Sequence, residues 1–265
     1  MAKVMIDPGH APGNTNSGKN GYYEYAGMWR LSNYLKAALE RCGVTAALTR
    51  TENADPSLAA RGKAAAGYDL FISQHSNAAN GAARGVEVYY SVRIPGDRDF
   101  AAEMARDTAA LMGSVNRGAK TREADAKGWD YYTVMLEAQK AGAKHVLLAE
   151  TGFHDNASDE AFLLVDVNLA KIAEAQAKVI CKYLGVAYKA LEGGASIGNP
   201  TDPTKPAIGA LENIMKVSVN GGAVRQIQSV LYKDYNYPNL RELCAMLGIP
   251  VDYDAATNTA LLTKK

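Results

Sequence analysis

The 265-residue sequence lacks several features that assign a chain to a common class at once. Its three cysteines, Cys42, Cys181 and Cys244, include no C-x-x-C pair, so we interpret them as buried helix thiols rather than a disulfide framework or a cysteine metal site. No apolar run approaches the roughly 20 residues of a membrane-spanning helix. The first apolar segment is interrupted by Asp7, so the sequence start does not resemble a signal peptide.

An excess of charge of one sign is also missing. The chain has 29 Lys and Arg against 28 Asp and Glu, and the residues up to 188 contain 21 of each kind. Because nucleic acids and anionic membranes are held largely by clustered positive charge, we expect neither a nucleic-acid partner nor membrane insertion. The length and the 48% hydrophobic content are typical of a globular chain of about two domains.

Residues 1–188 alternate between short apolar runs and amphipathic segments. Apolar runs that predict strands lie at 4–6, 44–48, 70–73, 86–90 and 146–149. Apolar residues at three- and four-residue steps predict helices at 28–42, 58–66, 100–115 and 169–183. This alternation predicts an α/β fold with a mostly parallel twisted sheet flanked by helices on both faces, as one domain over 1–188.

The composition changes after residue 188. Glycines and prolines without an apolar period predict a flexible linker over 189–211. Strand patterns at 214–219 and around Val251 and Leu261, with a helix at about 239–247, predict a small α+β domain over 212–265. A domain of about fifty residues has a marginal core, and domains this small are often stabilised by oligomerisation.

The four histidines are few enough for their positions to be informative. His10 follows the first predicted strand, His75 follows the third, and Glu150 ends the fifth. In open α/β sheets, ligands bind at the carboxyl ends of the strands, so these three side chains are expected at one edge. Glu24 lies 14 residues after His10, and the Gly- and Asn-rich loop 13–18 can fold it back over His10.

Two imidazoles and a carboxylate are a ligand set typical of catalytic zinc, which keeps its fourth position open. A second carboxylate beside that position can move protons during hydrolysis. We therefore predict that His10, Glu24 and His75 bind Zn²⁺ and that Glu150 is the catalytic base and acid. The alternative is structural: hydrogen-bonding histidines and a helix N-terminal acid, although Glu150 would then pay desolvation at a buried strand end.

Other polar residues are weaker candidates. His145 and His154 are expected to be structural or surface residues, and Arg50 and Arg61 to pair with carboxylates inside the fold. Candidates for substrate binding, with core packing as the alternative for the aromatic ones, are Asn77, Trp129, Tyr131 and Tyr132.

Six segments together resemble one known family: Ile6-Asp7-Pro8-Gly9-His10, Gly21 to Glu24, Leu48-Thr49-Arg50, Ile72 to Asn77, Gly85 to Val88 and Leu147 to Phe153. In order and spacing they resemble the zinc-dependent N-acetylmuramoyl-L-alanine amidases of the amidase type 3 family, which includes phage endolysins, autolysins and spore-cortex amidases. The resemblance extends over roughly residues 2–186. Ala11, where glycine is usual, and Gln74, where an aliphatic or small residue is more common, depart from the family pattern.

The resemblance implies hydrolysis of the amide between the lactyl group of N-acetylmuramic acid and L-alanine of peptidoglycan. It also implies His10, Glu24 and His75 as zinc ligands and Glu150 as the catalytic glutamate. Alternative functions are a zinc peptidase that cuts elsewhere in the stem peptide and a non-catalytic cell-wall-binding protein.

The C-terminal segments 237–243, 247–254 and 257–262 resemble the small stalk repeat named from the copper amine oxidase N-terminus. This part of the chain has no histidine, so copper binding is not implied. We expect peptidoglycan as the partner. Because tethering raises the effective concentration of the catalytic domain at its substrate, we expect wall-binding or self-association (oligomerisation) as the role of this domain, with a passive appendage as the alternative. The expected context is a phage or prophage endolysin that is made in the host cytoplasm without a signal peptide, acts at the wall after release and lyses the host cell.

Overall fold

The computed structural model describes residues 1–191, 213–219, 225–229, 251–254 and 259–262. Its contacts divide the chain into two units, Met1–Ala190 and Leu191–Lys265, which are described separately. Over the described ranges, none of the helices combines the length and the apolar character that crossing a membrane requires.

The first unit is built on a six-stranded sheet with the strand order β2-β1-β3-β6-β4-β5. The strands are β1 (Lys3–Pro8), β2 (Thr45–Leu48), β3 (Leu70–Asn77), β4 (Val86–Tyr90), β5 (Asn116–Lys120) and β6 (His145–Phe153). Only the β4 and β6 pair of this sheet is antiparallel. The predicted α/β fold with a mostly parallel sheet is therefore confirmed.

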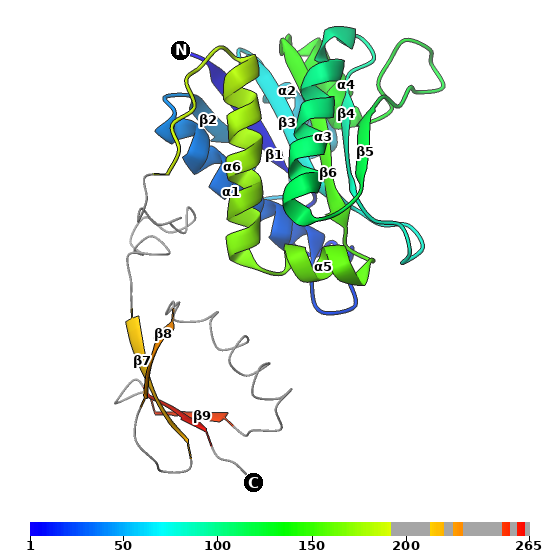
Figure 1. Ribbon diagram of the computed structural model, residues 1–265. Helices are drawn as coiled ribbons and strands as arrows, with labels where there is room; N and C mark the ends of the chain where they lie inside the picture. The colour runs from blue at the N-terminus through cyan, green and yellow to red at the C-terminus, as the bar shows by residue number, and fades with distance from the viewer. Residues whose placement is uncertain (192–212, 220–224, 230–250, 255–258, 263–265) are drawn as a thin grey trace. The chain divides into compact units, whose positions relative to one another are not determined.

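Helices cover both faces of this sheet (Figure 1). They are α1 (Glu24–Arg41), α2 (Leu58–Lys63), α3 (Arg98–Met112), α4 (Thr133–Lys140), α5 (Ala157–Leu163) and α6 (Asp166–Tyr183), with a 3₁₀ turn at Pro95–Asp97. Helices α1, α3 and α6 pack on one face, and α2 and α4 pack on the other. The 3.6-residue periodicity of the sequence predicted α1, α2, α3 and α6. Helices α1, α3 and α6 bury their apolar stripes against the sheet, whereas α2 buries Arg61 and Gly62 and leaves Leu58 exposed.

The candidate site lies on the face of the sheet that α2 and α4 cover. Its core joins Met5, Phe71, Val146 and Leu148 of the strands to apolar residues of α4, which are Val134, Met135 and Ala138. Side chains alternate along a strand, so the next positions on this face of β3 and β6 are occupied by Ser73, His75 and Glu150. His75 and Glu150 are only partly buried, since the core of this face does not extend to them.

Several elements differ from the sequence-based expectation. Strands β3 and β6 continue through polar residues beyond their predicted ends, so His75 and Glu150 lie within strands rather than after them. Strand β5 and helices α4 and α5 were not predicted. Strand β5 lies at the sheet edge and reads Asn-Arg-Gly-Ala-Lys, which has no apolar alternation for a sequence pattern to detect.

The second unit contains a four-stranded sheet with the order β8-β7-β10-β9. Its strands are β7 (Asn213–Val219), β8 (Arg225–Ser229), β9 (Val251–Asp254) and β10 (Thr259–Leu262). Strands β7, β9 and β10 correspond to the three predicted strands, whereas β8 was not predicted. The predicted helix at 239–247, Cys244 and residues 192–211 of the predicted linker lie outside the described residues; Cys42 and Cys181 are buried free thiols, as predicted.

Candidate metal centre

Three side chains from distant parts of the sequence converge at the carboxyl edge of the sheet. One ligand atom each of His10, Glu24 and His75 lies within 4.8 Å of the other two. His10 Nε2 is 3.1 Å from Glu24 Oε2, and His75 Nδ1 is 3.1 Å from Glu24 Oε1. Two atoms bound tetrahedrally to zinc at 2.0–2.1 Å are separated by about 3.3 Å, so this donor set fits a zinc ion in both chemistry and spacing.

The turn after β1 places His10 close to His75. Gly9 lies against the neighbouring strand, and a Cβ atom on it would come within 2.6 Å of His75 Cε1, so only glycine allows this approach. His10 itself has a φ of 57°, the only positive φ of a non-glycine residue in the described part of the chain. Because a left-handed backbone costs energy for such a residue, other contacts must hold the turn.

Arg61 supplies those contacts from helix α2. Its buried guanidinium donates hydrogen bonds of 2.8 Å to the carbonyl oxygens of both Pro8 and His10 and lies 3.5 Å from Asp7 Oδ1. The expected carboxylate pair is therefore present for Arg61. For Arg50 that expectation is wrong, because its guanidinium donates to backbone carbonyls, including that of Pro8 at 3.1 Å.

Glu24 is the first residue of α1 and is almost completely buried. Besides the two imidazoles, its carboxylate accepts hydrogen bonds from Asn16 Nδ2 at 2.9 Å and from the Ser76 backbone N–H at 3.0 Å. Burial opposes ionisation, but the two histidines outweigh it and hold the pKa of Glu24 well below its usual range. Glu24 is therefore ionised at neutral pH, as a metal ligand must be.

The pKa of His75 shifts in the opposite direction. Burial lowers it, but the hydrogen bond to Glu24 and the negative charges of Glu24, Glu150 and Asp7 outweigh burial and raise the pKa of His75 to about 9. Without a metal, His75 therefore carries a proton at neutral pH, which a cation has to displace.

The loop before α1 is anchored by Glu160 of α5. The buried carboxylate of Glu160 accepts from the Asn20 backbone N–H at 2.7 Å, from Asn20 Nδ2 at 2.8 Å and from the Tyr22 backbone N–H at 3.4 Å. These bonds fix the segment that leads directly into Glu24. Sequence reasoning did not identify Asn16, Arg61 or Glu160 as supports of the site, since no motif marks them and the partners of Arg61 and Glu160 are distant in sequence.

Glu150 lies beside the three candidate ligands. Its Cα is paired with that of His75 across strands β3 and β6. Its Oε2 is buried and has no hydrogen-bond partner within the described residues. Burial raises the pKa of Glu150 to about 7; the neighbouring His75 lowers it, whereas Glu24 and Glu87 raise it further. An unpartnered carboxylate oxygen with a pKa near neutrality suits a group that accepts and returns a proton.

On the other side of Glu150 lies a second buried carboxylate, Glu87 of β4. It accepts hydrogen bonds from Asn77 Nδ2 and Tyr89 OH, both at 3.1 Å, from Arg117 Nε at 2.7 Å and from Lys120 Nζ at 2.5 Å. Asn77, a predicted substrate contact, is thus bonded to Glu87. Sequence reasoning gave Glu87 no role, although a charge between Val86 and Val88 in a predicted strand is a signal for a buried polar network.

The three predicted aromatic contacts lie apart from the three candidate ligands, in and after the loop that follows β5. The ring of Tyr132 packs against Tyr89 at 5.1 Å and against Tyr131 at 5.4 Å. The Arg122 guanidinium lies 3.6 Å from the ring centre of Tyr131. Trp129 packs against the cations of Arg93 and Lys140, at 4.5 and 5.4 Å.

The other two histidines, His145 and His154, contact residues other than the three candidate ligands. His154 is buried, and its Nδ1 lies 3.0 Å from Ser76 Oγ. His145 Nδ1 lies 2.6 Å from Asp97 Oδ1 at the opposite end of β6. Both are structural contacts, as expected. The unusual Gln74 also has a structural explanation, because its side chain bonds to Gln176 of α6 at 2.7 Å.

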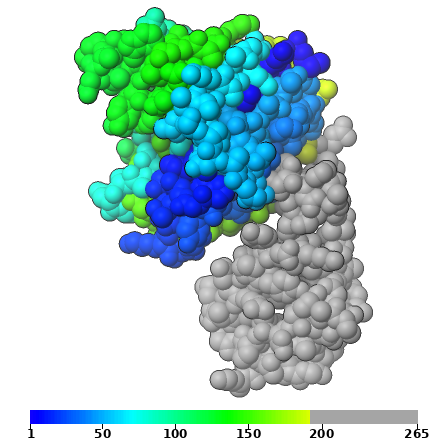
Figure 2. All heavy atoms as spheres, turned by 180° about the vertical axis from the view of Figure 1, so that it is seen from behind, coloured from blue at the N-terminus to red at the C-terminus, as the bar shows by residue number. Residues whose placement is uncertain are grey.

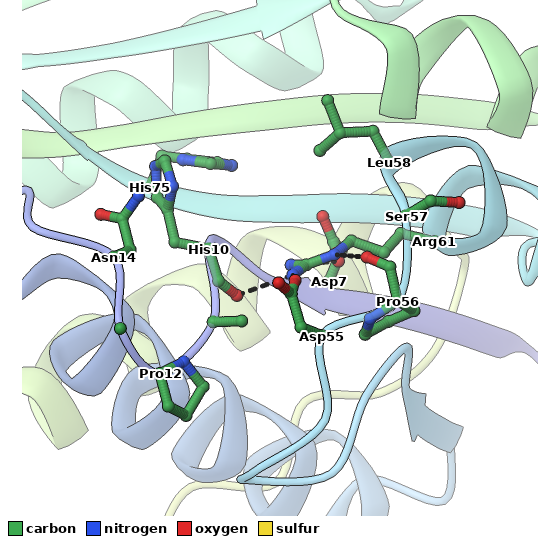
Figure 3. A pocket seen from close by; sticks show the side chains of 12 residues that line it. Asp7, His10, Pro12, Asn14, Asp55, Pro56, Ser57, Leu58, Arg61 and His75 are labelled. Carbon is green, nitrogen blue, oxygen red and sulfur yellow. Dashed lines mark hydrogen bonds and ion pairs between the residues drawn. The ribbon is translucent and has the colours of Figure 1, made fainter.

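A cavity of about 520 Å³ opens beside His10 and His75. Its lining comes from the loop after β1 and from the start of α2, whose surfaces adjoin in Figure 2. Figure 3 shows Asp55, Ser57 and Leu58 on the side of the cavity away from His75, with Arg61 between Asp55 and the His10 turn. A substrate can thus approach the candidate ligands from this side.

The fold and the site define an α/β protein with a candidate mononuclear metal centre at the carboxyl edge of its sheet. A family model described as N-acetylmuramoyl-L-alanine amidase (Amidase_3) matches residues 4–182. The chain belongs to this family.

The chain is also similar in sequence and structure to individual proteins. The N-acetylmuramoyl-L-alanine amidase LytC of Bacillus subtilis is 29% identical over 177 residues, which are 65% of this chain and 33% of LytC. Cwp6 from Clostridium difficile is similar in structure with a TM-score of 0.62 and 28% identity over 68% of this chain and 29% of Cwp6. The catalytic domain of the amidase CwlV from Bacillus (Paenibacillus) polymyxa gives 0.61 and 25% over 71% of this chain and all of that domain. The chain thus spans about a third of the length of LytC and of Cwp6.

Proposed function

We propose that this chain is a zinc-dependent N-acetylmuramoyl-L-alanine amidase that hydrolyses the amide between N-acetylmuramic acid and L-alanine in peptidoglycan. The observation that carries the proposal is the convergence of His10, Glu24 and His75 beside a carboxylate, Glu150, with an unpartnered oxygen. Membership of the amidase family and the names of the relatives support the same reaction.

Three residues would bind the metal ion, and a fourth would transfer the proton. His10 Nε2, His75 Nδ1 and a Glu24 oxygen would hold the ion, which when bound polarises the scissile carbonyl and acidifies water. Glu150 Oε2 accepts the proton of the attacking water as the new C–O bond forms. It then returns that proton to the alanine nitrogen as the C–N bond breaks, so that a free lactyl carboxylate and a free amine leave.

The direct test incubates purified peptidoglycan with the full chain, with and without a chelator, and identifies the new chain ends. We expect free N-terminal alanine in step with the fall in turbidity, loss of both with chelator, and recovery on adding zinc. Release of a different peptide terminus would instead show a peptidase that cuts elsewhere in the stem. Wall binding without any release would show a non-catalytic wall-binding protein.

We further propose that the chain acts as a phage endolysin that is made in the host cytoplasm and reaches the wall after release. A catalytic unit joined to a separate small unit suits this role, because tethering raises the effective concentration of the enzyme at its substrate. Expression in a susceptible bacterium, followed by permeabilisation of the membrane, should cause lysis by the wild type but not by Glu150→Gln. Lysis that is equal for both would contradict the endolysin role.

The second unit, which resembles the stalk repeat, is proposed to bind the wall or to self-associate. Truncation after Tyr188 should weaken sedimentation with purified walls or lower the mass of the particle in solution. If neither property changes, the unit has neither role.

A further inference from the structure

The two sides of the site differ in charge. Across the sheet, His75 of β3, Glu150 of β6 and Glu87 of β4 are successive Cα partners, and Gly118 of β5 pairs with Glu87. Adjacent strands are about 4.8 Å apart, so the β5 backbone lies about 10 Å from that of Glu150. The row thus leads from the candidate metal ligands to the edge strand of the sheet.

The β5 side carries three cations close to Glu87 and the neighbouring rings, namely Arg117, Lys120 and Arg122. Arg117 and Lys120 share the single carboxylate of Glu87, and each keeps about a third of its side chain exposed. Arg122 is exposed and stacks on Tyr131, and it forms no salt bridge within residues 1–191. Rings link this side to the site, because Tyr132 packs on Tyr89, whose hydroxyl bonds to Glu87. Three cations therefore lie near Glu87. Of the acids in the loop that follows β5, Glu123 is paired with Lys127, Asp130 is buried and accepts hydrogen bonds from Ser91 and Val92, and Asp125 is exposed.

The opposite side, toward α2, has a different character. Its exposed acid is Asp55, with 77% of the side chain accessible, and the exposed Ser57 and Leu58 line the same cavity. The cation of this cavity, Arg61, is buried and bonded to the His10 turn. This lining suits a sugar, because the sugar hydroxyl groups can donate hydrogen bonds to Asp55 and Ser57 and an N-acetyl methyl group can pack on Leu58. A carboxylate would instead be repelled by Asp55.

We propose, on the basis of the amidase function proposed above, that Lys120 and Arg122 bind a carboxylate of the stem peptide, so that the peptide crosses β4 toward β5 while the glycan lies toward Asp55 and Leu58. An extended peptide advances 3.3–3.6 Å per residue. Lys120 pairs with Tyr89, and its Nζ lies 2.5 Å from Glu87 Oε2, one strand from Glu150. The carboxylate therefore belongs to the first or second residue after alanine. Charge-assisted hydrogen bonds to such a group are stronger than those to an amide.

The experiment compares muramoyl peptides that are identical except that the residues after alanine carry either free carboxylates or carboxamides. We expect the full-length wild-type chain to prefer the carboxylate form about tenfold in kcat/KM, mainly through KM, and to lose the preference at high salt. Arg122→Gln and Lys120→Gln should each reduce the preference, and Arg122→Glu should reduce it most while sparing the carboxamide substrate.

Lys127→Gln is the matched control, since Lys127 lies in the same loop but is bonded to Glu123 and is 84% exposed. It should keep the full preference. Equal rates of wild type on both substrates, or an unchanged preference in Arg122→Glu, would overturn the inference. Arg122 packs on the surface without holding Glu87, so its variants test the inference even if Lys120→Gln is unstable. Failure to cleave either substrate at the alanine amide would instead overturn the proposed function.

Discussion

Glu24 and Glu87 are two buried carboxylates on either side of Glu150, and their partners differ in kind. Glu24 faces two imidazoles, a side-chain amide and a backbone N–H. Glu87 faces an amide, a phenol, a guanidinium (Arg117) and an ammonium group (Lys120). An imidazolium can release its proton to solvent so that a metal ion binds the freed nitrogen, whereas a guanidinium keeps its protons. The donors around a buried acid, more than the acid itself, therefore decide whether it suits a metal ligand or a structural anchor.

Removal of one of the two histidines that face Glu24 should have the largest effect. We expect His75→Ala to lose both the bound zinc and all measurable hydrolysis, because two protein ligands rarely hold a catalytic zinc ion. Metal content by atomic spectroscopy and release of N-terminal alanine measure the two effects. His145→Ala, which removes the imidazole beside Asp97, is the control and should keep the metal. Full zinc occupancy in His75→Ala would show that His75 is not a ligand.

Glu150, which lies between the two acids, tests catalysis apart from metal binding. Glu150→Gln preserves the shape of the side chain but cannot accept a proton, so we expect kcat to fall about 10²- to 10⁴-fold at unchanged zinc content. Glu40→Gln, at an exposed helix position bonded to Lys36, should leave kcat unchanged. A Glu150→Gln protein that remains fully active would rule out Glu150 as the base.

The pH dependence of zinc binding should distinguish the surroundings of Glu24 from those of Glu87. Since the pKa of His75 is raised to about 9 without metal, zinc binding at neutral pH must release its proton. Zinc affinity should therefore rise about tenfold per pH unit between pH 7 and 9 from this group alone. Calorimetry in two buffers of different ionisation enthalpy measures the released protons. Binding without proton release at pH 7 would contradict the proposed coupling of His75 and Glu24.

The smallest effect is expected at Glu87. Burial opposes its ionisation, but Lys120 and Arg117 outweigh burial and lower its pKa in the folded protein. Its contribution to stability is therefore complete above the ordinary value of 4.5 and declines as the pH falls toward the lowered pKa. Glu87→Gln should cost about 1–3 kcal/mol of unfolding free energy at pH 7, because the cations are partly exposed and can rehydrate.

Denaturant titrations of wild type and Glu87→Gln at pH 7 and at pH 3 check this prediction. The difference in stability should shrink at pH 3, which lies below the ordinary pKa of 4.5, because the unfolded chain then binds a proton that the folded Glu87, with its lowered pKa, binds less readily. A difference that grows on acidification would mean that Glu87 is not an ionised partner of Lys120 and Arg117.

The sequence predicted those helices and strands whose apolar residues repeat at a regular spacing. Helices α1 and α6 were predicted because buried residues such as Leu35 and Ile172 repeat at helical spacing. Strand β5 was missed because its pairing depends on backbone bonds to β4 and on polar contacts such as Lys120 to Glu87. Local periodicity contains no information about such distant partners.

For the site, strand ends and the scarcity of histidine were enough to bring His10, Glu24 and His75 under consideration together. Arg61 could not be assigned in this way, because its role is to bond carbonyl oxygens, which every residue has. Glu87 was also missed, since the cations that neutralise it come from the unpredicted strand β5. Supports of this kind depend on tertiary contacts rather than on residue type.

The pairing of His75 with Glu150 across β3 and β6 also limits which changes the proposed active site can tolerate. The spacing between these two residues is set by the backbone ladder of the sheet rather than by a loop. A slip of one residue would turn Glu150 to the opposite face, so insertions inside either strand should be lethal to the chemistry. Residues 55–58 line the cavity but supply none of the candidate ligands, so exchanging them between relatives offers a route to a different substrate preference with the ligand set unchanged.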